Sequence, residues 1–165
     1  MITITTLIEN SQGEHLALKI EHGVSFFVDT GDHAVLFDTG QSGTFISNAA
    51  QLRINLARIG HVVLSHGHYD HSGGLRSLLE VHRGFELVVG QGFFNEKWAE
   101  KNGSYEYLGN NFDEAFLKAA RVRYSQLADP VRELVPGVYV VGHFPRIHTD
   151  EPINPRFKLR QGTSF

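Results

Sequence analysis

A chain of 165 residues with 41% hydrophobic and 20% charged side chains has the size and composition of one soluble globular domain. Its net charge of −3, without a block of like charge, argues against nucleic-acid and membrane partners. The absence of cysteine excludes disulfides and thiolate metal ligands. The N-terminus lacks the pattern of a signal peptide or membrane span, so we expect a cytoplasmic protein.

The first third of the chain predicts three strands and a helix. Residues 2–8 are β-branched and alternate, and the apolar runs 24–30 and 33–40 are separated by a short turn, which predicts a hairpin. A helix ending at Gly60 follows, because apolar residues recur at spacings of four and three. This apolar face consists of Phe45, Ala49, Leu52, Leu56 and Ile59.

The middle of the chain alternates between strands and helices. Residues 61–65 form a short apolar strand, which the segment SHGHYDHSGG follows directly. Residues 75–82 share a helical face, and residues 86–90 form another buried strand. The alternation predicts an α/β fold with a parallel sheet. Open α/β sheets place their sites at the carboxyl ends of strands, which is where SHGHYDHSGG lies.

The last third has weaker patterns. Short helices are predicted for residues 92–101 and 112–120, the first from the spacing of Phe94 and Trp98. Strands are predicted for 121–125, 131–135 and 137–142, with a tight turn at Pro136-Gly137. From Pro145 onward, prolines without periodicity predict an extended loop.

SHGHYDHSGG places four potential metal ligands in six consecutive positions. His66 and His68 are two apart, so in an extended segment they point the same way, and Gly67 lets the backbone bend close to an ion. Asp70 and His71 can aim at a neighbouring position, so two pairs would suit two ions roughly 3.5–4 Å apart. Imidazole and carboxylate suit zinc, iron or manganese. The alternatives are a chance cluster, or a structural metal site, which usually includes cysteine.

At this point a family resemblance becomes visible. SHGHYDHSGG resembles the HxHxDH signature of the metallo-β-lactamase superfamily of metallohydrolases. FDTGQSGTF, VVLSHGHYDHSGGL and GVYVVGHFPR resemble the branch that includes the dihydropterin phosphate synthases of methanopterin biosynthesis. The resemblance implies an α/β sandwich of two similar αβ halves with the metals at their shared edge. Residues 1–165 would form a single, incomplete domain that is mainly the first half.

The resemblance also implies the site residues. Its metal ligands would be His66, His68, Asp70, His71 and His143. The first two would hold one ion and the next two a second, with Asp70 also acting as the catalytic residue that orients the water or receives its proton. Asp38 would brace the ligand loop by hydrogen bonding, unless it only forms a turn.

Other histidines carry weaker expectations. His143 lies where this branch often has glutamate, so its alternative is a loop histidine without a metal, and His148 is a weaker candidate still. His61 and His82 are expected to be structural. His15, His22 and His33 have no ligand-like spacing.

The expected activity is metal-dependent hydrolysis. An activated water would attack a small-molecule ester, phosphoester or lactone. No GxSxG, cysteine nucleophile or phosphate-binding loop competes with this interpretation. Four basic residues would favour an anionic substrate, unless they form only a solvated tail: Arg146, Arg156, Lys158 and Arg160. A metal-independent α/β domain would require the cluster to be accidental.

The chain departs from the branch it resembles in one respect. The SHAG-like and GGFHL-like segments of that branch have no counterpart here. The alternative function is therefore a metal-binding but inactive module that needs a partner chain or a lost segment. A fragment of a longer protein, a split gene with a complementing chain, and association of two copies all remain open. In each case the first sheet should expose an apolar face or edge.

Overall fold

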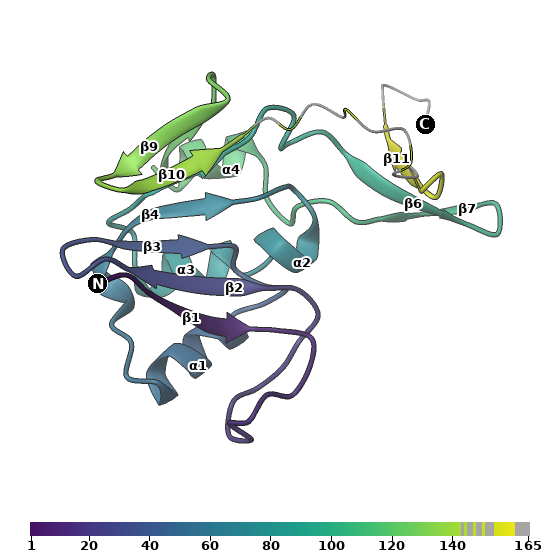
Figure 1. Cartoon of the computed structure of the whole chain (residues 1–165). Helices are drawn as coiled ribbons and strands as arrows, with labels where there is room; N and C mark the ends of the chain where they lie inside the picture. The colour runs from purple at the N-terminus through teal and green to yellow at the C-terminus, as the bar shows by residue number, and fades with distance from the viewer. Residues whose placement is uncertain (143, 145–146, 148–149, 151–153, 161–165) are drawn as a thin grey trace.

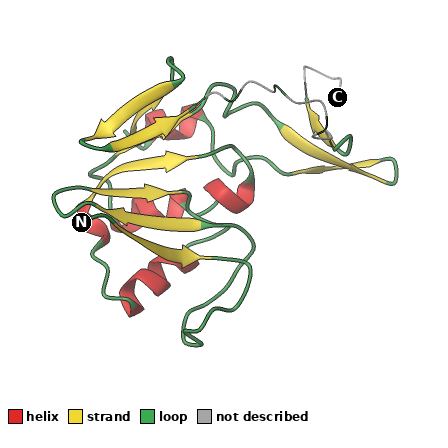
Figure 2. Cartoon of the chain, in the orientation of Figure 1, coloured by secondary structure: helices red, strands yellow, loops and turns green. Residues whose placement is uncertain are grey.

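The structure, a computed structural model, describes residues 1–142, 144, 147, 150 and 154–160. Its main body is a six-stranded sheet (Figures 1 and 2), in which β1 and β2 and then β2 and β3 pair antiparallel, and the remaining neighbours pair parallel. The fold is therefore α/β, as predicted. In sheet order the strands are β1 (Thr3–Ile8), β2 (Ser25–Asp29), β3 (Ala34–Phe37), β4 (Ile59–Leu64), β5 (Glu86–Val89) and β8 (Arg123–Gln126).

Helices cover one face of this sheet, behind it in Figure 1. They are α1 (Thr44–Gln51), α3 (Leu75–Val81) and α4 (Glu114–Ala119), while the short α2 (Tyr69–Ser72) lies beside the carboxyl end of β4. Phe45 of α1, Leu78 of α3 and Leu87 of the sheet are fully buried in one hydrophobic core. Burial of each such side chain stabilises the fold by about 1.5–3 kcal/mol. No helix in the described part of the chain is long and apolar enough to cross a membrane.

The first helix is shorter than the sequence predicts. It ends at Gln51, and Arg53 takes the left-handed conformation with φ 56°. The N–H of Ile54 bonds back to the carbonyl of Ala49, as in a Schellman motif. The chain then forms a 3₁₀ turn over Leu56–Arg58 and enters β4, so Gly60 lies in a strand and ends no helix. The predicted apolar face is thus divided between a helix, a turn and a strand.

A three-stranded arm replaces the helix predicted for residues 92–101 and part of the predicted C-terminal loop. Its strands are β6 (Lys97–Lys101), β7 (Ser104–Tyr107) and β11 (Phe157–Leu159), and it projects from the body in Figure 1. Asn102 and Gly103 join the first two strands with φ 53° and 77°. This Asn-Gly turn is a strong hairpin signal, and it prevails over the helical spacing of Phe94 and Trp98.

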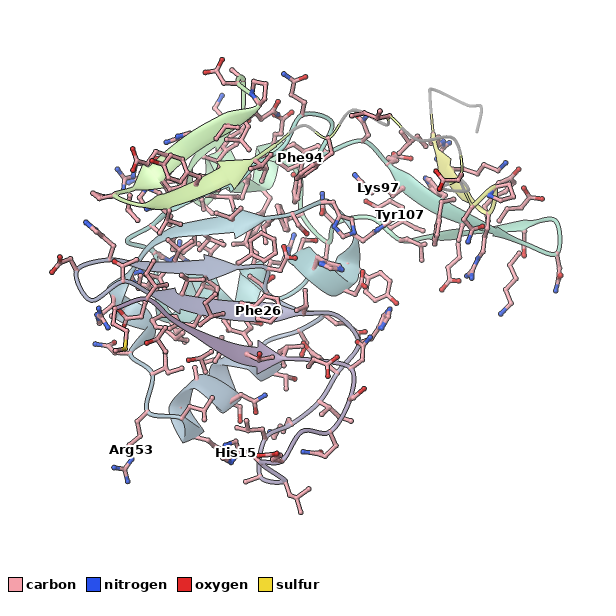
Figure 3. The ribbon with its side chains drawn as sticks, viewed as in Figure 1. His15, Phe26, Arg53, Phe94, Lys97 and Tyr107 are labelled. Atoms are coloured by element: carbon pink, nitrogen blue, oxygen red, sulfur yellow. The ribbon has the colours of Figure 1, made fainter. Side chains whose placement is uncertain are left out.

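The other face of the sheet is only partly covered. The hairpin of β9 (Val131–Val135) and β10 (Val138–Val141) packs against Val63 and Val88, and its turn at Pro136-Gly137 is as predicted. Beside it lies an apolar hollow of about 800 Å³, lined in part by Phe26 (Figure 3). Ile4 of β1 is 66% exposed at this face. The expectation of an exposed apolar sheet face is confirmed.

Candidate metal centre

The histidine cluster lies at the carboxyl end of β4, as predicted. β4 ends at Leu64, the chain bends at residues 65–67, His68 is extended, and α2 begins at Tyr69. Since β3 and β4 are parallel neighbours, the residue after β3, Asp38, emerges at the same edge of the sheet. The topology therefore brings FDTG and SHGHYDH together although they are far apart in the sequence.

Gly67 allows the ligand loop to press against the segment that leads into the arm. A Cβ at this position would lie 2.2 Å from the carbonyl oxygen of Phe93. It would also lie 2.9 Å from both Asn110 Nδ2 and Lys97 Nζ. Since no side chain fits in this space, the backbone between the two histidines is held in place by close contact.

Asp38 is a fully buried carboxylate at the centre of the hydrogen-bond network. Its backbone is left-handed, with φ 57°, a conformation that aspartate tolerates better than most residues. Its Oδ1 accepts from the Ser65 N–H at 2.7 Å. Its Oδ2 accepts from Ser65 Oγ and contacts His71 Nδ1, each at 2.7 Å. The predicted bracing of the loop by hydrogen bonding is therefore present.

These bonds determine which nitrogen of two imidazoles carries the proton. The Ser65 hydroxyl donates its only proton to Asp38, so its oxygen accepts from His66 Nδ1 at 2.9 Å. His71 Nδ1 likewise donates to the carboxylate. In their neutral form both rings therefore carry a lone pair on Nε2, the form that metal-binding histidines take when a neighbour accepts from the other nitrogen.

The structure brings His66, His68, Asp70 and His71 together, although not as two separate pairs. The His66 ring centroid lies 4.7 Å from that of His68 and 4.2 Å from that of His71. His71 Nε2 lies 3.6 Å from Asp70 Oδ2. Among the residues described, no three histidine or acidic side chains already enclose a position for one ion. The donors fit a metal in type and tautomer, while the coordination shell needs further ligands or side-chain rotation.

The pKa values of the three imidazoles differ. Burial, with the neighbouring His71 and His68, lowers the pKa of His66 to about 4, and burial also lowers the pKa of His68. Burial opposes protonation of His71 too, but the hydrogen bond to Asp38 and the charges of Asp38 and Asp70 raise its pKa overall. At neutral pH, His66 and His68 are thus neutral and able to bind a cation.

The shift at His66 predicts a pH-dependent stability of the metal-free protein. The unfolded chain binds a proton at His66 near pH 6.5, whereas the folded chain does so only near about 4. Stability should therefore be lost as the pH falls from about 6.5 to about 4. His71 opposes this trend, so the measurement is the urea unfolding free energy of wild type minus that of His66→Gln across this range. A difference that does not change with pH would contradict the shift.

The remaining histidines divide between structural and unexpected positions. His82 Nε2 lies 2.9 Å from the Ile59 carbonyl oxygen, consistent with the structural role expected of it. His143 and His148 lie outside the described residues. His22, which has no ligand-like spacing, nevertheless lies with Nε2 3.4 Å from Asp70 Oδ2. The sequence also does not predict the hydrogen bonds of Ser65 to Asp38 and His66, because the order of residues around Ser65 gives no sign of them.

A family model and individual relatives match this chain. The model described as the metallo-β-lactamase superfamily matches residues 19–150. The 7,8-dihydropterin-6-methyl-4-(β-D-ribofuranosyl)-aminobenzene-5′-phosphate synthase of Methanocaldococcus jannaschii is 28% identical over 161 residues, which is 93% of this chain and 53% of that one. An uncharacterized protein of the same organism is 26% identical over 129 residues, 76% of this chain and 48% of that one.

A solved structure agrees with these matches. The crystal structure of a metal-dependent hydrolase of the β-lactamase superfamily aligns with a TM-score of 0.76 and 27% identity. The alignment covers 98% of this chain and 55% of that one. The chain thus spans about half the length of the relatives that it matches.

Proposed function

This chain belongs to the metallo-β-lactamase superfamily, and on that premise we propose that it is a metal-dependent hydrolase of small anionic esters, phosphoesters or lactones. The observation that supports this most is the Asp38 network, in which one buried carboxylate directs the proton of both His66 and His71 to Nδ1.

The proposed ligands are His66, His68, Asp70 and His71, with His143 as a fifth candidate. A bound ion, zinc first and iron or manganese as alternatives, would lower the pKa of a coordinated water and polarise the bond under attack. Asp38 and Ser65 accept from Nδ1 of His71 and His66, which leaves Nε2 of each neutral ring for the ion. Asp70 orients the attacking water and takes up its proton.

The arm supports an anionic substrate. The Phe157 ring lies 5.9 Å from the His68 ring, so β11 forms a wall beside the centre. The guanidinium of Arg156 lies 6.0 Å from the centroid of the Phe157 ring. Lys158 and Arg160 face Glu100 and Glu96 at 3.8 and 3.5 Å, which offsets their charge, so Arg156 is the preferred anion-attracting residue. The relative from Methanocaldococcus jannaschii is named for a 5′-phosphate compound, in keeping with this choice.

A second candidate function is a metal-binding module that is inactive until another polypeptide completes it. Two observations favour this candidate. Three ligands do not yet converge within the described residues, and the outer face of the sheet carries an apolar hollow of about 800 Å³. A complementing chain or a second copy would cover that face.

Elemental analysis of the purified chain, followed by hydrolysis assays with added zinc or manganese, separates the two candidates. The hydrolase should hold at least about one ion per chain and cleave a generic phosphoester or lactone. Because His68 is a proposed ligand, His68→Ala should lose most of the metal and the turnover. The exposed His33 offers a control, since His33→Ala should leave both unchanged. Bound metal that His68→Ala removes, without turnover in either protein, would support the inactive module instead. Little metal and no turnover, unaffected by His68→Ala, would contradict the hydrolase.

A further inference from the structure

A histidine outside the motif, His22, reaches the proposed ligand Asp70 from a distant segment. His22 Nε2 lies 3.4 Å from Asp70 Oδ2, and His71 Nε2 lies 3.6 Å from the same oxygen. The His22 ring also lies beside Tyr69, with ring centroids 6.3 Å apart. The carboxylate, 16% exposed, is thus approached by two imidazoles, only one of which belongs to the histidine cluster.

The residue before His22 is tied to the loop that follows β3. The Glu21 carboxylate accepts from the backbone N–H groups of Gln41 and Ser42, each at 3.0 Å. It also accepts from Ser42 Oγ at 2.6 Å. These bonds hold the chain immediately before His22 against the same edge of the sheet from which Asp38 emerges.

The residue after His22 is fitted against Asp70 itself. Gly23 has φ +113°, and a Cβ there would lie 1.8 Å from the Asp70 carbonyl oxygen. Its N–H donates to Asn10 Oδ1 at 2.7 Å. Because the backbone is held on both sides, the approach of the His22 side chain to Asp70 is set by the fold and is not a chance contact of a free loop.

We infer that His22 is a positioning residue that holds the Asp70 carboxylate in the orientation in which it binds the ion. Its side chain is 60% exposed, so it contributes little to the core. The bonds made by Glu21 and Gly23 hold the backbone on both sides of it and so keep the side chain beside Asp70. A partner that hydrogen-bonds to a ligand carboxylate restricts its rotation, and such contacts often tighten when the site is filled. The inference rests on the proposed function, since it assumes that Asp70 is a ligand.

Zn²⁺ affinity of the 165-residue chain, measured by competition with a chromophoric chelator, tests the inference. Loss of an outer partner of a ligand typically weakens affinity 10–100-fold, so we expect about 30-fold for His22→Ala. His22→Gln keeps an N–H donor of similar reach but is a poor ligand, so it should stay within about threefold of wild type. His15→Ala is the matched control, because His15 is exposed on the same long loop (Figure 3) and should have no effect.

The unfolding free energy of the metal-free variants distinguishes positioning from a structural role. It should be the same in His22→Ala and wild type. Weakened binding that merely accompanies a loss of metal-free stability would overturn the inference, as would a His22→Gln variant as weak as His22→Ala. Equal Zn²⁺ affinity of wild type and His22→Ala would overturn the inference about His22 but leave the proposed function standing. A wild-type chain that binds no Zn²⁺ would overturn both.

Discussion

Replacing Asp38 with asparagine is expected to weaken Zn²⁺ binding by about 10–100-fold and to destabilise the metal-free protein by about 1–3 kcal/mol. Asparagine has the same size and tolerates the left-handed backbone, so the fold should persist. Its amide nitrogen cannot accept a hydrogen bond, so the fully buried side chain can no longer serve the Ser65 N–H, Ser65 Oγ and His71 Nδ1 together. Both imidazoles that depend on this carboxylate lose the partner that directs their protons.

Asp29→Asn is the matched control for Asp38→Asn. Asp29 ends β2 and bonds to Arg58 at the surface, away from the centre. The same change of carboxylate to amide there should leave Zn²⁺ affinity unchanged. Chelator competition measures the affinity, and urea unfolding of the metal-free proteins measures the stability. If Asp38→Asn binds Zn²⁺ as tightly as Asp29→Asn does, the Asp38 network does not prepare these histidines for a metal.

Replacing Gly67 with alanine is expected to lower the unfolding free energy by about 3 kcal/mol or more. The methyl group would enter a space in which the Phe93 carbonyl oxygen lies 2.2 Å from the Cβ position. The obstacle is backbone, so rotation of a side chain cannot relieve it. The ligand loop must then move away from the segment leading into the arm. We therefore expect Gly67→Ala to lose Zn²⁺ affinity as well as stability.

Gly60 provides the control on the neighbouring strand. It lies in β4, and a Cβ there would meet no atom within 4 Å. Because alanine reduces the conformational freedom of the unfolded chain, Gly60→Ala should be neutral or stabilising by about 0.5–1 kcal/mol. Urea unfolding of both variants gives the comparison. Similar unfolding free energies for the two variants would show that the close contact between Gly67 and the Phe93 carbonyl does not contribute to stability.

Much of the sheet and the location of the centre could be predicted from local pattern. Alternation and apolar runs identified the hairpin of β2 and β3 and the buried strands β4 and β5, because each of these strands presents one or two faces to a core. The density of histidine after β4 identified the centre. The bracing role of Asp38 was implied by the family resemblance and not by local pattern, and its bonds to Ser65 and His71 agree with it.

Local pattern failed where two signals competed. The helical spacing of apolar residues continues from Phe45 to Ile59, although the helix itself ends at Gln51. The helix ends because Arg53 takes a left-handed conformation, and the spacing of apolar residues carries no sign of that conformation. In the arm, the helical spacing of Phe94 and Trp98 competes with the Asn102-Gly103 turn, and the hairpin forms because this turn reverses the chain. The third strand of the arm, β11, is stabilised by pairing with β6, a partner far away in the sequence.

The amino-acid sequence on its own determined the α/β class and the presence of a histidine-rich loop at a strand end, because both depend on residues close together in the chain. Only the tertiary structure decided which nitrogens of His66 and His71 carry protons, because Ser65 and Asp38 meet through the parallel pairing of β3 and β4. The approach of His22 to Asp70 likewise depends on bonds between distant loops. Such contacts follow from the packing of the whole chain, and no local spacing encodes them.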